Sequence, residues 1–285
     1  MAMIARSGPA PALAALLPGG RLHLQHGPID ILAEAFGEPA AVRVAYARSA
    51  ARFASILQDL MAELPALRSE GAVVEGVIAR RMAAAIAPFR PAFITPMAAV
   101  AGAVAEEVLA ALVGPGIVRA YANNGGDIAL WLAPGERLTC ALAVSGGADR
   151  VTVAATDLVR GIATSGWRGR SFSLGIADAV TVVARTAAMA DAAATMVANA
   201  VDLDHPGIRR RPAREVQCDS DLGDRLVTVA VPPLSPEELA LALDAGLSAA
   251  EAFRATGLIE GAALFLQGER RLTGALALAE GDASG

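Results

Sequence analysis

Apolar and polar positions alternate along several short stretches of the chain, which predicts β-strands joined by tight turns. Residues 21–26 and 29–36 alternate on either side of a Gly-Pro turn, and the same pattern recurs at 117–120 and 128–132. Because successive side chains of a strand point to opposite faces, each stretch can bury one face. The sequence therefore predicts hairpins and an antiparallel sheet. Further strands are expected at 137–144, 177–184, 226–231, 262–267 and 271–278, whereas residues 151–155 suit either a strand or a loop.

Other stretches carry apolar residues at steps of three and four, which is the period of an amphipathic helix. Residues 40–64 and 73–87 show this pattern, and a proline follows each of them. A third helix is predicted over 97–113, with Thr95 as its N-cap and a proline at its first position. The first half of this helix is almost entirely Ala, Val and Gly, which favours close packing, although a helix start can also bind an anion. A fourth helix is predicted over 187–201. Helices packed on hairpin-built sheets define a mixed α+β fold.

The last third of the chain predicts a surface excursion and two helix starts. Residues 202–220 are polar and rich in Arg, so we expect them to be solvated. Ser235 opens a capping box for a helix that reaches about residue 245, and a second box at Ser248 predicts another helix start. Residues 145–149 are expected to form a turn between two strands.

The stretch Asn123-Asn124-Gly125-Gly126-Asp127 separates two alternating runs. Gly and Asn adopt positive φ at low cost, so this composition is typical of a hairpin turn. A simple turn needs only two such residues. Three polar side chains and two glycines, whose backbone groups are not covered by a side chain, can also shape a pocket for a phosphate, a sugar or a ring. From this stretch alone, both a plain hairpin and a ligand-binding loop remain open.

Composition narrows the classes of function. The chain has 285 residues and a formal net charge of −5, so it lacks the basic surface that nucleic-acid binding requires. Hydrophobic residues make up 54% of the chain but aromatic residues only 4%, which predicts a core of small aliphatic side chains. No apolar run long enough to span a membrane is free of helix breakers, and the N-terminus does not resemble a signal peptide. We expect a cytoplasmic protein.

Reactive residue types are few. All 24 basic residues are Arg, which excludes lysine chemistry such as Schiff-base formation. The three histidines, His23, His26 and His205, do not form a ligand pattern. The two cysteines, Cys140 and Cys218, are far apart, which argues against a zinc knuckle or a disulfide framework. Cys140 lies in an apolar run, where we expect it to be buried.

Two later stretches carry candidate ligand groups. Asp191 and Thr195 are one helical turn apart, so they project from one face of an otherwise Ala-rich helix. They suit either a solvated Asp beside a Thr that bonds its own helix, or a site for a hard cation such as Mg²⁺. Residues 161–166 combine Gly with Thr and Ser and are followed by two arginines, a composition that can hold an anionic group.

Taken in order, these pieces resemble the ApbE-like superfamily, whose best-known members are FAD:protein FMN transferases. The Gly-containing helix start over 97–112, the turn 124–127, the Ala-Thr-Ser-Gly loop 163–166 and the Ala-Asp-x-x-x-Thr motif 190–195 follow the family order. The resemblance covers about residues 93–201. The flanks are most similar to the short, stand-alone UPF branch of this superfamily, whose members are of uncharacterised activity.

The resemblance implies a duplicated T-fold-like arrangement of antiparallel sheets and a cleft that binds FAD or FMN together with Mg²⁺. It implies that Asp191 and Thr195 are Mg²⁺ ligands. Cofactor-binding residues implied by the family or by the predicted helix start are Thr95, Asn123, Asn124, Gly125, Gly126, Asp127, Thr164, Ser165 and Gly166.

The chain departs from the transferases at two reactive positions. Where they carry Lys-Gly, this chain reads Ala101-Gly102, with Glu106 in the place of their acidic residue and therefore as a candidate catalytic carboxylate. The His of the transferases has no counterpart, and Leu174 lies nearby. Two interpretations follow. One is a flavin- or nucleotide-handling transferase relative. The other is a non-catalytic module that assists assembly or cofactor delivery for a partner enzyme, and a homo-oligomer is also compatible with the Ala-rich helices.

No linker divides the chain into autonomous domains, and no repeat of fixed period is visible. We expect one ApbE-like domain over 19–278, a loosely ordered segment over 1–18 and a frayed tail over 279–285.

Overall fold

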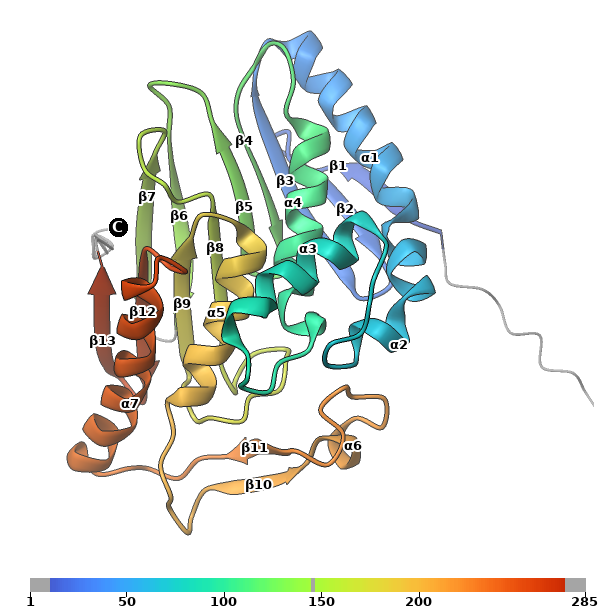
Figure 1. Ribbon diagram of the computed structural model, residues 1–285. Coiled ribbons are helices and arrows are strands. Elements are labelled where there is room, and N and C mark those ends of the chain that lie inside the picture. Colours follow the sequence, from blue (N-terminus) through green and yellow to red (C-terminus); the bar gives the residue numbers. More distant parts are fainter. Residues whose placement is uncertain (1–10, 145–146, 275–285) are drawn as a thin grey trace, which may run out of the picture.

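One antiparallel sheet of nine strands organises the computed structural model, which describes residues 11–144 and 147–274 (Figure 1). The strands are arranged in the order β1-β2-β3-β4-β5-β8-β9-β12-β13. Their bounds are β1 Leu13–Leu16, β2 Leu22–His26, β3 Ile29–Gly37, β4 Ile117–Asn124, β5 Asp127–Leu132, β8 Gly161–Ser165, β9 Ala179–Ala184, β12 Gly261–Leu266 and β13 Glu269–Gly274. The prediction of an α+β fold built from antiparallel hairpins is confirmed.

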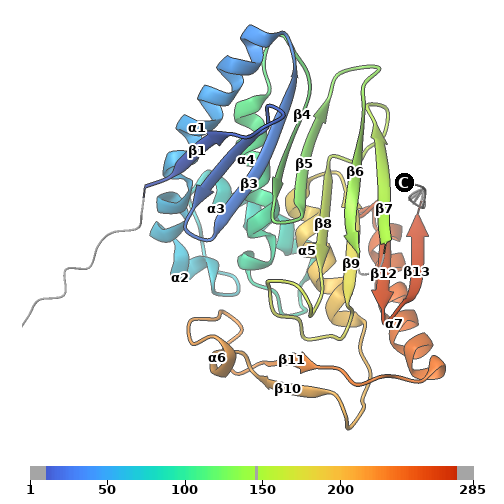
Figure 2. The same cartoon turned by 180° about the vertical axis from the view of Figure 1, so that it is seen from behind.

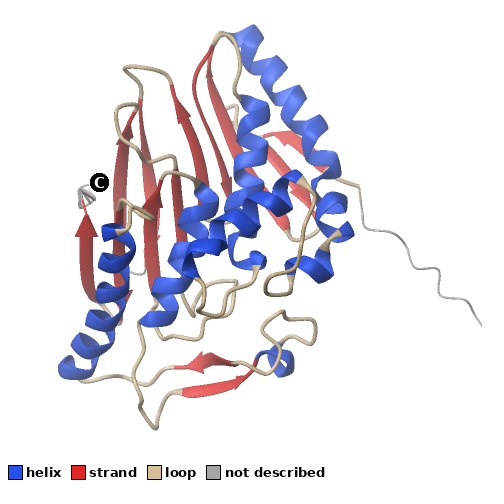
Figure 3. Ribbon diagram, in the orientation of Figure 1, coloured by secondary structure: helices blue, strands red, loops and turns tan. Residues whose placement is uncertain are grey.

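The long helices cover one face of this sheet (Figures 1 and 3). They are α1 Pro39–Ala62, α3 Val77–Ile86, α4 Val100–Leu112, α5 Ala187–Ala200 and α7 Pro236–Ala255. Short helical turns lie between them: α2 Leu64–Leu67, η1 Ala87–Phe89, η2 Pro96–Ala99 and α6 Ala213–Val216. No helix in the described part of the chain is long and apolar enough to cross a lipid bilayer.

The connectivity repeats once along the chain. In each half a hairpin is followed by helices and then by a second hairpin: β2-β3 and β4-β5 in the first half, β8-β9 and β12-β13 in the second. The halves meet where β5 pairs with β8, through Ile128↔Ile162 and Ala129↔Gly161. This duplicated arrangement agrees with the expectation that came from the resemblance, although the sequence shows no repeat.

Two further hairpins lie outside the large sheet. The β6 (Arg137–Val144) and β7 (Gly147–Ala154) hairpin packs on the face opposite the helices (Figure 2). It covers a small core made of Ile128, Leu130, Leu132, Cys140, Val151, Val153, Ile162 and Val183. Cys140 is buried as predicted, and burial raises the pKa of its thiol to about 11. Residues 151–155 suited either a strand or a loop in the sequence. In the structure, residues 151–154 belong to β7 and residue 155 follows it. The other hairpin pairs β10 (Arg209–Pro212) with β11 (Leu226–Ala230).

Small residues bring α4, α5 and the sheet into close contact. A Cβ added at Gly102 would lie 2.2 Å from the carbonyl oxygen of Ala187, and one added at Gly161 would lie 2.2 Å from the carbonyl carbon of Thr186. Real Cβ atoms do not approach backbone atoms so closely, so Gly is required at both positions. The close packing predicted for the start of the third helix is therefore confirmed.

Several predicted boundaries differ from the structure. Residues 13–16, within the segment expected to be loosely ordered, form β1 because they pair with β2. The capping box predicted at Ser248 is wrong. That residue lies inside α7, because Leu243, Gly246 and Ala250 continue the buried face of the helix. Residues 209–212, predicted to be part of a solvated excursion, pair with β11.

The first and second predicted helices are each shorter than expected, and a short helical turn follows each of them. The stretch 97–113 begins with the 3-10 turn η2, and α4 starts at Val100. Residues 145–146 of the predicted turn, residues 275–278 of the last predicted strand and the tail 279–285 lie outside the described residues. The remainder of the last hairpin is confirmed as β12 and β13.

Candidate functional site

The tip of the β4–β5 hairpin is a two-residue turn. Gly125 and Gly126 have φ values of 66° and 117°, and Asn124 pairs with Asp127 across the ends of the strands. The Asn123 Oδ1 atom accepts a hydrogen bond from the Gly126 amide at 2.8 Å. Positive φ at both central positions explains why two glycines stand here. The interpretation of this stretch as a hairpin turn is therefore confirmed.

Strand alternation divides those polar residues between the two faces of the sheet. Ala122 and Ala129 belong to the core under the helices, whereas Ile128 belongs to the core on the opposite face. Asn124 and Asp127 therefore point towards the helices, because side chains two residues apart share a face. The Asn124 amide donates to the carbonyl oxygen of Ala101, at the start of α4, over 3.1 Å. Asn123 lies on the opposite face, away from α4.

Two carboxylates interact on the helix side of the sheet, one from a strand of the first half and one from a helix of the second half. Asp127, only 8% exposed, accepts a hydrogen bond from the Thr164 amide at 3.1 Å. Asp191, on α5, accepts one from the Gly102 amide at 3.0 Å. Burial raises the pKa of Asp127 to about 7. Burial, together with the charge of Asp127, holds the pKa of Asp191 well above its usual range. We call Asp127 and Asp191 the acidic pair.

Positive charge near the acidic pair is limited. Arg170 lowers the pKa of Asp127, but less than burial raises it. The Arg170 guanidinium also donates to the carbonyl oxygen of Pro28 at 3.0 Å. A buried and a partly buried carboxylate with too little positive charge around them favour either a shared proton or a bound cation. Sequence reasoning placed Asp127 and Asp191 in one cleft, but it did not show that their charges interact.

Thr195 lies one turn after Asp191 on α5 and is partly exposed. Its hydroxyl makes no hydrogen bond within residues 11–144 and 147–274, so its lone pairs are open to a ligand. The hypothesis that it bonds back to its own helix is therefore wrong. Its place one turn from Asp191 keeps it a candidate ligand, because residues at i and i+4 share a helix face.

The described residues contain no cluster of three or more His, Cys, Asp and Glu side chains that could hold a metal. A cation at the acidic pair would therefore take its remaining ligands from hydroxyl or carbonyl oxygens and from water. That donor set fits Mg²⁺, which usually keeps several waters and binds one or two carboxylates.

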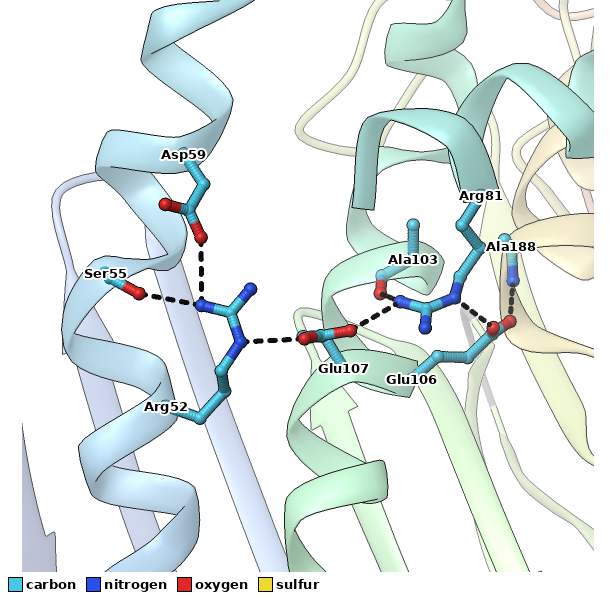
Figure 4. Close-up of polar contacts among 8 residues, drawn as sticks. All are labelled: Arg52, Ser55, Asp59, Arg81, Ala103, Glu106, Glu107 and Ala188. Atoms are coloured by element: carbon cyan, nitrogen blue, oxygen red, sulfur yellow. Dashed lines mark hydrogen bonds and ion pairs between the residues drawn. The ribbon is translucent and has the colours of Figure 1, made fainter. Parts of the chain in front are cut away.

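Glu106 is engaged at the N-terminus of α5. Its carboxylate accepts a hydrogen bond from the Ala188 amide at 2.8 Å and pairs with Arg81 at 3.0 Å. Arg81 also pairs with Glu107 at 3.1 Å, and Glu107 pairs with Arg52 of α1 at 2.7 Å (Figure 4). Burial raises the pKa of Glu106 despite the amides and the arginine that favour its charge. These contacts join α1, α3, α4 and α5, so Glu106 helps to hold the helices together. Its catalytic role stays a prediction.

The side chains of the Ala-Thr-Ser-Gly loop also lie on both faces of the sheet. The Thr164 hydroxyl lies on the face away from the helices, 2.9 Å from the Thr181 hydroxyl. Only its backbone amide reaches Asp127. Ser165, the next residue, points to the helix face and is partly exposed. Gly166 has a φ of 151°, and a Cβ there would lie 2.5 Å from the carbonyl oxygen of Asp178. The loop therefore offers Ser165, rather than Thr164, to the helix side.

Thr95 does not cap a helix with its side chain. It stands at the N-cap position of η2, but its hydroxyl donates to the carboxylate of Asp221 at 2.5 Å. The residue is 3% exposed. The N-cap hydrogen bond predicted for Thr95 is wrong, because a carboxylate from the segment between β10 and β11 competes for its hydroxyl. Sequence reasoning missed Asp221, since nothing in the local pattern brings residues 95 and 221 together.

The fold and the acidic pair define an α+β protein of two similar halves, with a candidate cation site made by residues from both. A family model described as AbpE bacteria matches residues 14–272. Because that match covers most of the chain, the chain belongs to this family.

Relatives carry the name UPF0280 protein. The chain is 36% identical to the one from Methanopyrus kandleri over 173 residues, covering 60% of this chain and 66% of the relative. It is 38% identical to the one from Methanothrix thermoacetophila over 133 residues, covering 45% and 53%. It is 36% identical to the one from Methanococcoides burtonii over 121 residues, covering 40% and 49%. The chain spans about half the length of the curated relatives it matches.

Proposed function

We propose that the chain binds Mg²⁺ through the acidic pair and Thr195, and uses it to hold a phosphorylated, ring-bearing cofactor of the flavin type. The observation that carries the proposal is the meeting of a carboxylate on β5 with one on α5, each held by a backbone amide. Backbone donors fix the orientation of the two carboxylates without neutralising them. A divalent cation would offset their repulsion.

A phosphate group would be the natural partner of such a cation. Mg²⁺ in proteins is commonly bound by one or two carboxylates together with the phosphates of a ligand. Ser165 on the helix face and Arg170 beside the turn supply a hydroxyl and a guanidinium that could bind phosphate oxygens. The choice of FAD or FMN rests on the resemblance to the ApbE-like superfamily, with which the AbpE bacteria family is compatible.

Isothermal titration calorimetry tests the cation site. We expect Mg²⁺ to bind the protein freed of metal by EDTA, and Asp191→Asn to weaken binding about ten-fold or more, because one charged ligand is lost. Asp224→Asn is the matched control, since Asp224 is exposed and pairs with Arg214 at 2.7 Å, away from the acidic pair. Equal affinity of the wild type and Asp191→Asn would remove the metal assignment.

A separate titration tests whether the protein binds a flavin cofactor. FAD, FMN and ADP are titrated with and without Mg²⁺. A flavin site predicts that FAD or FMN binds more tightly than ADP and that EDTA weakens the binding. If none of the three binds while Mg²⁺ does, the cation site stands and the flavin assignment is lost.

A second candidate function is a non-catalytic module that delivers a cofactor or assists the assembly of another enzyme. The engagement of Glu106 by Arg81 and the α5 amide favours it, because a carboxylate held in this way is not free to act as a base. Ala101 stands where the transferases carry Lys, which also removes a reactive group. Reproducible FMN transfer by the purified chain would reject this candidate, and a cofactor bound without turnover would support it.

A further inference from the structure

A hollow of about 530 Å³ opens between the two halves of the sheet, and its walls include neither member of the acidic pair. It lies between α4, the middle of β5 and the segments that lead into β8 and α5. At this point β5 leaves β8, because the last ladder pair is Ala129↔Gly161 and only the Leu130 amide still reaches the carbonyl oxygen of Arg160, at 3.0 Å. The volume is in the range of small-molecule sites.

One side of the hollow is apolar. Leu109 of α4, Val113 directly after α4 and Trp131 of β5 line it, and all three are partly exposed. A partly exposed indole beside aliphatic side chains offers a surface on which a planar ring can stack. This wall therefore favours a ligand with an aromatic or heterocyclic body.

The other side carries three arginines, and two of them already have carboxylate partners. Arg81 is held between Glu106 and Glu107, at 3.0 and 3.1 Å (Figure 4). Arg185 pairs with Glu260 at 3.1 Å. The charge of each is therefore largely balanced within the protein.

Arg160 is different. Its guanidinium donates to the carbonyl oxygens of Ala155, Asp157 and Val159, at 2.8, 2.7 and 2.5 Å. Within the part of the chain that the structure describes, no carboxylate lies within ion-pair distance of it. Three carbonyls hold the group in place without neutralising it. A planar guanidinium that is fixed and lacks a counterion is prepared to bind a carboxylate or a phosphate.

We propose that this hollow is a second binding site, for a small ring-bearing anion whose ring lies against Trp131 and whose carboxylate or phosphate faces Arg160. The site is independent of the acidic pair and of any metal there. The ligand class is an aromatic or heterocyclic monoanion or phosphate monoester, because the hollow offers one unbalanced cation and one apolar wall.

Calorimetry on the full chain in EDTA tests the site, so that no metal at the acidic pair contributes. The probes are salicylate, adenosine monophosphate, adenosine and inorganic phosphate. We expect saturable binding of salicylate or adenosine monophosphate, which distinguishes a carboxylate from a phosphate ligand. Adenosine and inorganic phosphate should each bind at least ten-fold more weakly, since each lacks either the charge or the ring.

Two variants test the residues. Arg160→Gln should weaken binding about ten-fold or more, because a hydrogen bond to a charged group is lost. Ala110→Phe adds a ring at an exposed position of α4 that lines the hollow, and it should block binding without touching Arg160. Arg254→Gln, at an exposed position of α7, is the matched control. Thermal unfolding checks that each variant folds.

The outcomes are decisive in either direction. Loss of binding in Ala110→Phe with retention in Arg254→Gln supports the site even if Arg160→Gln fails to fold. Unchanged affinity in Ala110→Phe, or no saturable binding by any probe, overturns it. Because EDTA is present throughout, failure here leaves the proposed Mg²⁺ site untouched, and failure of that site does not affect this one.

Discussion

At Asp127, tertiary placement changes the chemistry of a residue that the sequence places in a turn. The Asp127 side chain is buried, and burial, the largest of the effects on its pKa, raises that pKa to about 7. An acid whose pKa is raised in the folded state binds its proton more tightly there than in the unfolded chain. The free energy of unfolding therefore falls as pH rises from the unfolded pKa, 3.8, through the folded pKa, and the full cost is present above it.

This shift predicts a pH-dependent stability. Without metal, Asp127 should contribute a loss of roughly 4 kcal/mol of unfolding free energy between about pH 4 and pH 8, and Asp191, whose pKa is also raised, adds to the loss in the same direction. Asp127→Asn should lose less over the same range, because the contribution of Asp127 is gone and Asp191 no longer faces its charge. Urea unfolding in EDTA at several pH values measures both. An identical pH dependence in the two proteins would show that Asp127 is not the group responsible, and added Mg²⁺ should restore stability to the wild type at about pH 8.

At the scale of elements, α5 is positioned by contacts from α4. Gly102 allows the two backbones to approach, and Glu106 accepts a hydrogen bond from the first turn of α5. An acidic group at a helix N-terminus satisfies free amides and interacts favourably with the helix dipole. The same contacts fix Asp191 one turn further along α5, where the Gly102 amide reaches it.

Removing the Glu106 side chain should loosen this junction. We expect Glu106→Ala to lower the free energy of unfolding by about 1–3 kcal/mol, because a cap and a partly buried ion pair are both lost. Glu106→Gln should cost less, since its amide oxygen can still accept from Ala188. Glu251→Ala, at an exposed position of α7, serves as control and should change stability by less than about 0.5 kcal/mol. A Glu106→Ala protein as stable as the wild type would show that the junction does not depend on this residue.

At the scale of the whole molecule, the two halves are held together by a short ladder and by cores on both faces. Ile162 is fully buried and lies at the β5–β8 seam, in the core under the β6–β7 hairpin. The helix-side core crosses the same seam through α4 and α5. The halves should therefore unfold together.

Ile162→Ala should destabilise the whole protein by about 2–5 kcal/mol, because it opens a cavity at the seam. Leu158→Ala, at a position 56% exposed, should cost far less. The free energy of unfolding of each variant is measured by urea unfolding, followed by tryptophan fluorescence and by circular dichroism. Coincident curves are expected from the two methods. Separate transitions for the two signals in the wild type would contradict the single cooperative unit.

The fold could be predicted from the sequence to a large extent, and the candidate site only in part. The Gly125-Gly126 turn and the β2–β3 hairpin were predictable because turn chemistry and alternation are local. Thr95 and Ser248 were predicted less well, because a distant carboxylate and the packing of α7 override the local signal. The resemblance placed Asp127 and Asp191 in one cleft, but Asn123 and the Thr164 side chain, also expected there, lie on the opposite face.

By itself, the sequence determined the strands, most helices and the turn at Asn123–Asp127, because hydrogen bonding and side-chain periodicity act over a few residues. Tertiary structure alone decided which side chains meet. Alternation assigns a residue to a face, but only the pairing of strands and the packing of α4 against α5 bring Asp127 beside Asp191. The same long-range packing occupies Glu106 with Arg81 and leaves Arg160 facing an open hollow, neither of which any local pattern encodes.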